Sequence, residues 1–215
     1  GSIPRPDRKL SATYTEEPPQ DGERVVMLRR VGDVGLVGLL YHVPAGSHPE
    51  FPAVQVLASI LGSEPSGRLY KALVETKKAS SISVGSFGQH DPGTIEIMAE
   101  VNTKDLAALE KVRDEIYKVL DEVVQQGVTK EEVDRARQKM LRDRELAAAE
   151  PSRIAIMLSN WASQGDWRLY FLNRDRLEEV TPEKVKEVAA SYLAPSNRTV
   201  GYFVPSEKPK RTPVP

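Results

Sequence analysis

The sequence predicts an α+β fold: a largely antiparallel sheet of about five to six strands with helices packed on one face. Two observations carry this prediction. Strand-like segments come in neighbouring pairs before residue 102, and helical periodicity dominates from residue 104 until a last strand-like segment near the end. Strands paired in this way, with most helices gathered behind them, are typical of α+β domains.

The first pair of strands is expected at 25–30 and 34–43, around a turn at Gly32-Asp33. Valine and leucine dominate both segments, as in strands that have a buried face. Two helices are predicted next, at about 51–61 and 66–77. In the second strand, we expect three apolar side chains to be buried: Val34, Leu36 and Leu40.

The second pair of strands is expected at 79–88 and 93–101, on either side of the sequence His90-Asp91-Pro92-Gly93. Apolar and polar residues alternate from Thr94 to Val101, which is typical of a strand with one buried and one exposed face. The two segments therefore predict a hairpin with a longer loop.

A long helix is predicted from about residue 104 to 126, ending at Gly127. Thr129 and Glu132 have the spacing of a capping box and predict the start of the next helix. The long helix is indicated by six apolar residues that recur at intervals of three or four: Leu106, Leu109, Val112, Ile116, Val119 and Val123.

Glu150-Pro151 interrupts the helical run, and a further helix is predicted at 152–164. Thr181-Pro182 predicts another helix, because it combines a capping residue with proline at the first helical position. The sequence RTVGYFV at 198–204 predicts the last strand. Four aromatic residues of this half are expected to lie in the core: Trp161, Trp167, Tyr170 and Phe171.

One domain is expected between two polar ends. Residues 1–22 predict an extended, proline-rich lead-in, residues 23–205 a single α+β domain, and residues 206–215 a tail rich in proline and lysine. The chain has 215 residues, 40% of them hydrophobic, which is enough for one substantial core. Gly1-Ser2 has the look of a cloning scar, which predicts a piece of a longer chain.

Composition excludes several functions. The chain has 30 basic and 31 acidic side chains, without the basic excess that nucleic-acid binding requires. It has no cysteine, so it forms no disulfide and no thiolate zinc site. No apolar run approaches the roughly 20 residues that span a membrane.

Motifs for phosphate and metal binding fit poorly. GSEPSGRL at 62–69 approaches the phosphate-loop pattern, but Arg68 replaces the lysine, Leu69 replaces the hydroxyl, and a helix precedes it instead of a strand. We therefore interpret this stretch as a tight connection between helices. The three histidines show no spacing typical of zinc ligands and are expected in exposed loops: His42, His48 and His90.

Four stretches resemble the pitrilysin/insulinase family of zinc metallopeptidases. They are EEPPQDGERVVMLRR (16–30), YHVPAGSHPEFPAVQVLASILGSEPSGRLYKALVETKKASSISVG (41–85), TKEEVDRARQKM (129–140) and VTPEKVKEVAASYLAPSNRTVGYFVP (180–205). The resemblance implies one of two similar α+β halves that close around an extended peptide. The first half of such proteins carries zinc on an H-x-x-E-H motif, whose glutamate acts as general base.

The resemblance places this chain as the second, C-terminal, non-catalytic half. Gln55 and Ser59 stand where the two histidine ligands would be, and Ala58 stands where the base would be. The helix that would supply a distal glutamate ligand offers Glu131 and Glu132. The resemblance therefore implies a degenerate motif, with no catalytic residue and no metal in this chain, and with zinc in the parent or partner catalytic half.

Many second halves contribute an arginine and a tyrosine to the cleft. The matching positions here are Val74 and Ser81, and neither fits; Arg68 and Tyr70 stand nearby in a different register. A direct contribution to catalysis is therefore not expected from these positions.

Two functions remain. The chain is either the non-catalytic half of a zinc metalloendopeptidase, completing a peptide cleft, or a scaffold or assembly subunit related to processing-peptidase-like proteins. An upstream H-x-x-E-H would favour the first.

A Ser-rich edge strand would hold peptide by β-addition: Ser80, Ser81, Ile82 and Ser83. The expected partners are a catalytic half and a peptide or protein substrate; similar bacterial proteins imply a periplasmic or envelope location.

Overall fold

The computed structural model describes residues 19–208 and has an α+β architecture, as the sequence predicts. Most of the expected lead-in (1–22) and tail (206–215) lies outside the described residues. Five strands form one sheet in the order β1-β5-β2-β4-β3. Their bounds are β1 (Arg24–Val31), β2 (Gly35–Val43), β3 (Ser81–Phe87), β4 (Gly93–Val101) and β5 (Arg198–Ser206). Only the β1–β5 pair is parallel, which confirms a largely antiparallel sheet.

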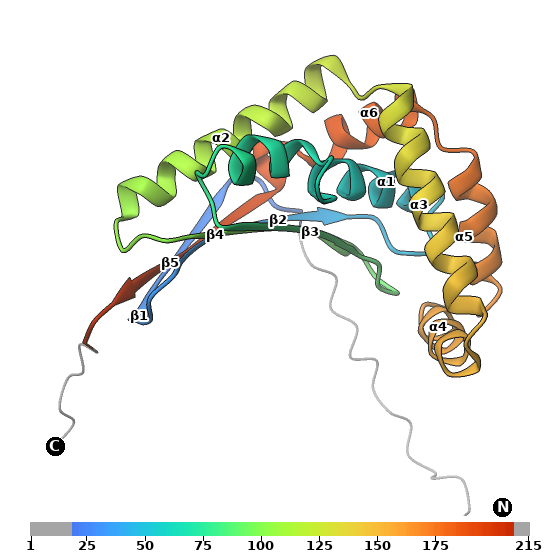
Figure 1. Ribbon diagram of the computed structural model, residues 1–215. Coiled ribbons are helices and arrows are strands. Elements are labelled where there is room, and N and C mark those ends of the chain that lie inside the picture. The colour runs from blue at the N-terminus through green and yellow to red at the C-terminus, as the bar shows by residue number, and fades with distance from the viewer. Residues whose placement is uncertain (1–18, 209–215) are drawn as a thin grey trace, which may run out of the picture.

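The helices cover one face of this sheet and one of its ends (Figure 1). Helices α1, α2 and α6 lie over the sheet, α3 and α5 stand at its end, and α4 extends below the level of the strands. The second predicted helix is mostly a π-helix, η1 (Tyr70–Glu75). The other helices are α1 (Phe51–Gly62), α2 (Leu106–Gln126), α3 (Lys130–Ala148), α4 (Pro151–Ser163), α5 (Leu169–Glu178), α6 (Pro182–Tyr192) and the 3-10 turn η2 (Pro195–Asn197).

The core lies between the sheet and its helical layer. Alternate residues of the central strands β2, β4 and β5 point into it, and the periodic face of α2 packs against them, as predicted. Helix α3 begins with the predicted capping box of Thr129 and Glu132. The largest fully buried side chains include Tyr41, Phe51, Leu57, Leu61, Ile97 and Ile116.

The predicted pairing of the first two strands is wrong. Strand β5 lies between β1 and β2 and pairs with both, parallel to β1 and antiparallel to β2. Inserting β5 in the sheet interior buries its alternating residues Val200, Tyr202 and Val204. Strand β5, about 170 residues from β1 along the chain, therefore takes the place beside β2 that a local hairpin would give to β1. It does so because its buried face is more apolar than the one that the exposed strand β1 would supply there.

The predicted buried face of β2 is also wrong. Val37, Leu39 and Tyr41 are at most 2% exposed and point toward the helices. Leu36 and Leu40 occupy the alternate positions and are only half-buried on the opposite face; Val34 precedes the strand and is 37% exposed. Both faces of β2 are apolar, so period-two alternation cannot tell which side the helices cover.

The aromatic residues of the second half lie mostly outside the core. Tyr170 is buried, but Trp167 and Phe171 are 47% and 43% exposed. Helix α5, which carries two of these aromatics, was not predicted, because polar residues interrupt any apolar periodicity. Within α4, none of the described side chains is buried, although the helix contains isoleucine, methionine, leucine and tryptophan.

Candidate functional site

Helix α1 carries the three positions that the resemblance matches to a zinc motif: Gln55, Ala58 and Ser59. Proline in its first turn favours helix initiation, and its apolar residues pack onto β2, β3 and the other helices. Ala58 is only 4% exposed and points into this core. Gln55 and Ser59, one turn apart on the same side, are half-buried at the edge of the core. The helix thus keeps two neighbouring polar positions but has no acid or base between them.

The two polar side chains of α1 bind different partners. Ser59 Oγ lies 3.0 Å from Ser63 Oγ, at the end of the helix. Gln55 Oε1 accepts a hydrogen bond from Asn173 Nδ2 of α5 at 3.1 Å. Asn173 Oδ1 in turn accepts from Arg144 of α3. Gln55 therefore connects α1 to α5 and, through Asn173, to α3, whereas Ser59 bonds only to Ser63 at the end of α1.

The carboxylate of Glu132 is engaged within the chain. Arg68 Nε and Nη2 donate to its two oxygens at 2.8 Å each, and the backbone N–H of Thr129 donates at 2.8 Å. These charge-assisted bonds, with the Arg68 bonds foremost, lower the pKa of Glu132 below its usual range. Glu131, the alternative distal position, is exposed. The carboxylate of Glu132, which the resemblance suggested as a distal ligand, is therefore already paired with Arg68.

A pocket of about 340 Å³ lies between α1, the loop that follows it, and α3. Ser59 and Glu132 both line it, so the structure brings together two of the positions that the resemblance singled out. Gln55 does not line it and turns toward α5 instead. Across residues 19–208, no group of three or more histidine, aspartate or glutamate side chains is placed to hold a metal ion.

The three histidines lie in separate places along the described chain. His42 lies within β2, half-buried on the face away from the helices, so its expected loop position is wrong. His48 follows that strand and is exposed, as predicted. His90 is also exposed, in the connection between β3 and β4, where its Nδ1 lies 3.3 Å from Asp91 Oδ1.

The residues near the expected arginine and tyrosine positions serve internal packing. Val74 lies in η1 and packs against the core, as does Tyr70. Arg68 is committed to Glu132. Ser81 begins β3 and is half-buried. Arg68 is therefore not a free cation, and Val74 and Ser81 have neither a cationic nor a phenolic group.

Strand β3 forms one edge of the sheet in the described part of the chain. Ser80 precedes it, and both its backbone N–H and its hydroxyl donate to Glu100 O of β4. Glu100 pairs in register with Ser81, and its C=O faces β3. Alternation along the strand therefore places the N–H groups of Ile82, Val84 and Ser86 at the outer edge. Ile82 is 5% exposed and anchors the strand in the core.

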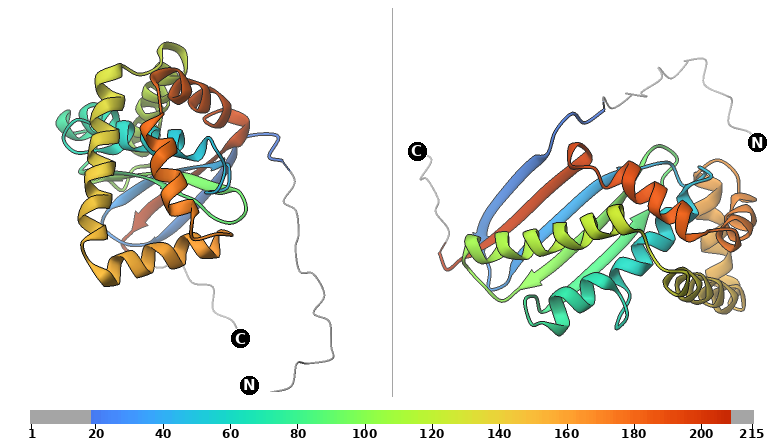
Figure 2. Two further views of the ribbon diagram at one scale, coloured as in Figure 1. Left: turned by 90° about the vertical axis from the view of Figure 1, so that its right-hand side faces the viewer. Right: turned by 90° about the horizontal axis from the view of Figure 1, so that it is seen from above.

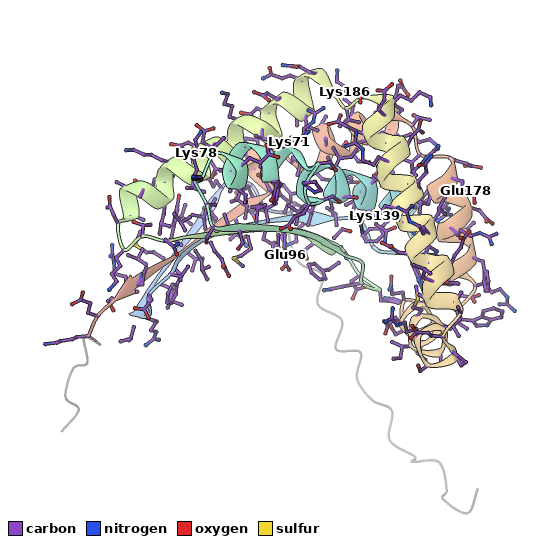
Figure 3. All side chains as sticks on the ribbon, in the orientation of Figure 1. Lys71, Lys78, Glu96, Lys139, Glu178 and Lys186 are labelled. Carbon is purple, nitrogen blue, oxygen red and sulfur yellow. The ribbon has the colours of Figure 1, made fainter. Side chains whose placement is uncertain are left out.

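The sheet face opposite the helices is a second exposed surface, which we call the open face. Gly38 and Gly201 are cross-strand neighbours there, with Met98 beside them. They line a shallow, mainly apolar hollow of about 210 Å³. Figure 3 shows Glu96, also a lining residue, pointing from β4 into the space below the sheet. No helix of the described chain lies over this hollow (Figure 1).

Strand β1 extends this surface to the other edge of the sheet. All eight of its residues are exposed, with Val25, Val26 and Val31 each more than half exposed. Seen from above, β1 lies outside the area that α2 and α6 cover (Figure 2). A strand that is apolar and exposed on both faces is typical of a surface that another polypeptide covers.

The fold, with no metal-binding group among residues 19–208, fits one class: the inactive half-domain of a metallopeptidase. The family comparison agrees, since residues 1–140 match the model of the peptidase M16 inactive domain. The chain therefore belongs to this family.

Individual relatives support the assignment. The chain is 38% identical to the inactive peptidase domain of a proposed zinc protease from Bordetella parapertussis, covering 87% of this chain and 99% of that one, with a TM-score of 0.76. It is 24% identical over 201 residues to the zinc protease PqqE of Helicobacter pylori, covering 93% of this chain. The chain spans 45% of that curated relative's length.

The fold also resembles one part of a larger solved structure. The periplasmic protease PqqL of Escherichia coli matches with a TM-score of 0.71 and 18% identity, over 95% of this chain and 23% of PqqL. Over residues 19–208, none of the helices combines the length and apolar content that crossing a membrane requires.

Sequence reasoning missed the polar network around Gln55. Asn173 is 4% exposed, and the guanidinium of Arg144 also donates to Tyr170 O and stacks 4.1 Å from the Tyr170 ring. Burial lowers the pKa of Arg144. A single buried asparagine in a polar helix carries no sequence signal. The capping box placed Glu132 at a helix start, but nothing local in the sequence indicates that Arg68, 64 residues away, pairs with it.

Proposed function

We propose that this domain is the non-catalytic half of a zinc metalloendopeptidase and completes the peptide cleft of a catalytic half. That half is carried by the same longer chain or by a partner subunit. The observation that carries the proposal is an inactive peptidase fold whose open face and β1 are apolar and uncovered. A domain with no metal ligands of its own contributes to peptide hydrolysis through such a surface.

The catalytic half is the proposed occupant of the uncovered surface. The chain spans 45% of the curated relative, and the rest of that relative is at least as long as the matched part. The apolar hollow around Gly38 and Gly201 admits protruding side chains close to the backbone. Burial of Val26, Leu28 and Met98, each more than 40% exposed here, would stabilise the assembly.

Peptide binding is proposed at the β3 edge. The N–H groups of Ile82, Val84 and Ser86 face outward, and the small side chains of Ser81 and Ser83 let a second backbone approach. Ser80 contributes no free donor, because its N–H and hydroxyl are bonded to Glu100 O. The strand is therefore expected to hold peptide through backbone hydrogen bonds rather than through charge.

The assembled peptidase tests the β3 proposal. Ser86→Pro removes one outward N–H, and Ser86→Ala keeps it while removing the hydroxyl. With the catalytic half present, we expect Ser86→Pro to lower kcat/KM by about tenfold or more, and Ser86→Ala to stay near wild type. Circular dichroism establishes that both variants are folded. A folded Ser86→Pro variant with unchanged kcat/KM would contradict the role of this strand.

The isolated chain is expected to bind no catalytic zinc and to cleave no peptide. Metal analysis after dialysis, together with a fluorogenic peptide assay, measures both properties. Stoichiometric zinc with chelator-sensitive cleavage would refute the non-catalytic assignment. In the parent sequence, a second degenerate copy in place of H-x-x-E-H would favour the scaffold function instead.

A periplasmic or envelope location is proposed from the likeness to the periplasmic protease PqqL. Fractionation of cells that produce the full-length parent protein measures it directly. Recovery of the protein with cytoplasmic markers alone would contradict this location.

A further inference from the structure

The pocket between α1 and α3 is lined by basic and hydroxyl groups. Arg135, Lys139 and Arg142 follow one another at intervals of four and three residues and line it from α3. Figure 3 labels Lys139 in the space between α3 and α1. The opposite wall is formed by α1 and the loop after it, which contribute three hydroxyl groups: Ser59, Ser63 and Ser66.

The acidic groups of the pocket do not balance these cations. Glu132 is neutralised by its two bonds to Arg68. Glu64 lies on an exposed loop position. Within residues 19–208, Arg135 and Arg142 have no hydrogen bond or ion pair. Lys139 has only an exposed pair with Asp143, which is worth little in water.

We propose that this pocket binds a small oxyanion of the phosphate class, either free phosphate or a phosphomonoester. Guanidinium groups donate to phosphate oxygens through two parallel N–H bonds, and serine hydroxyls donate further bonds. The space of about 340 Å³ accommodates such an ion with part of an attached organic group. The pocket beside the degenerate metal position is thus suited to an anion instead of a cation.

This binding site is independent of the proposed peptidase role. The residues that form it lie on α1, on the loop after α1 and on α3. The open face and the β3 edge belong to the sheet and lie elsewhere. A failure of phosphate binding therefore leaves the peptide-cleft proposal intact, and the reverse also holds.

Calorimetric titration of the 215-residue chain tests the proposal at constant ionic strength. Inorganic phosphate and glycerol 2-phosphate are the two probes, and succinate tests whether a dicarboxylate competes. We expect saturable phosphate binding and a rise in Tm with phosphate that chloride does not reproduce. Tighter binding of glycerol 2-phosphate would assign a phosphomonoester, and equal or weaker binding would assign the free ion. Tighter binding of succinate would overturn the phosphate class.

The variant Arg135→Gln/Arg142→Gln removes both unpaired guanidinium groups. We expect it to bind phosphate about tenfold more weakly or not at all. Arg153→Gln/Arg168→Gln is the matched control, because it removes the same charge at exposed positions outside the pocket. Ser66→Asp, which adds a carboxylate to the wall, provides a second test should the double variant not fold. Equal phosphate affinity in wild type and pocket variants, or no saturable binding, would overturn the proposal.

Discussion

The two faces of the sheet differ in how completely this chain covers them. On the helical side, Val37, Leu39 and Tyr41 are at most 2% exposed. On the open side, Val26 and Met98 are 58% and 41% exposed. One face therefore supplies the stability of the domain, while the other is the surface that we propose for the catalytic half. The difference separates two kinds of mutation: those that unfold the chain and those that affect only its association.

On the helical side, polar side chains are also paired within the chain. Gln55 is bonded to Asn173, and Glu132 to Arg68. Positions that would need to stay available for a metal are instead partnered inside the chain. In this region both side chains therefore serve to hold the helices together.

The largest expected effect is on the core side of α1. Leu57→Ala should lower the free energy of unfolding by about 2–5 kcal/mol, because Leu57 is 1% exposed and its removal leaves a cavity. The same change at Leu28, which is 46% exposed on β1, should cost within about 0.5 kcal/mol. Urea denaturation measures both. Wild-type stability for Leu57→Ala would mean that α1 lines an open site.

The next largest loss of stability is expected from breaking the ion pair between Arg68 and Glu132. Glu132→Gln should cost about 1–3 kcal/mol at neutral pH, since both side chains are less than one quarter exposed. The pKa of Glu132 is lowered in the folded protein, so the pair stabilises fully above the pKa of the unfolded carboxyl group. This contribution is lost as the pH falls toward the lower folded pKa.

The pH dependence of the difference between wild type and Glu132→Gln checks this assignment. The difference in unfolding free energy should be largest above about pH 5 and should shrink in more acidic solution. Glu64→Gln, at an exposed carboxylate without such a pair, should show no comparable trend. A Glu132→Gln effect that does not change with pH would rule out the ion pair as its cause.

A smaller loss is expected from Gln55→Ala. It removes the acceptor for Asn173 Nδ2 and leaves that buried amide unsatisfied, at a cost of about 1–2 kcal/mol. Gln138→Ala, at an exposed glutamine on α3, should change stability by less than about 0.5 kcal/mol. Thermal melting of both variants compares them. Equal melting temperatures would show that the Gln55–Asn173 bond contributes nothing net.

The smallest effect on stability is expected on the open face. Met98→Glu should leave the unfolding free energy within about 0.5 kcal/mol of wild type, because the side chain is already partly in water. It should nevertheless weaken binding to the catalytic half, since a carboxylate would be buried there. Lys111→Glu, at an exposed position on α2, serves as the control. Unchanged affinity for Met98→Glu would place the interface elsewhere.

Much of the fold was predictable from local patterns. Alternation from Thr94 to Val101 and the three-and-four spacing along α2 indicated a strand and a helix, and both are present. The capping box at Thr129 is present as well. The peptide role of Ser81 and Ser83 stays a prediction, because it depends on a molecule that this chain does not contain.

The sequence by itself determined most of the elements, with α5 as the exception, because helix periodicity and capping are local properties. The tertiary structure alone decided the position of β5 between β1 and β2, the helix-covered side of β2, and the pairing of Arg68 with Glu132. Each of these depends on residues far apart in the chain. Their contacts are chosen by the total apolar area buried and by the satisfaction of charges, which no single segment contains.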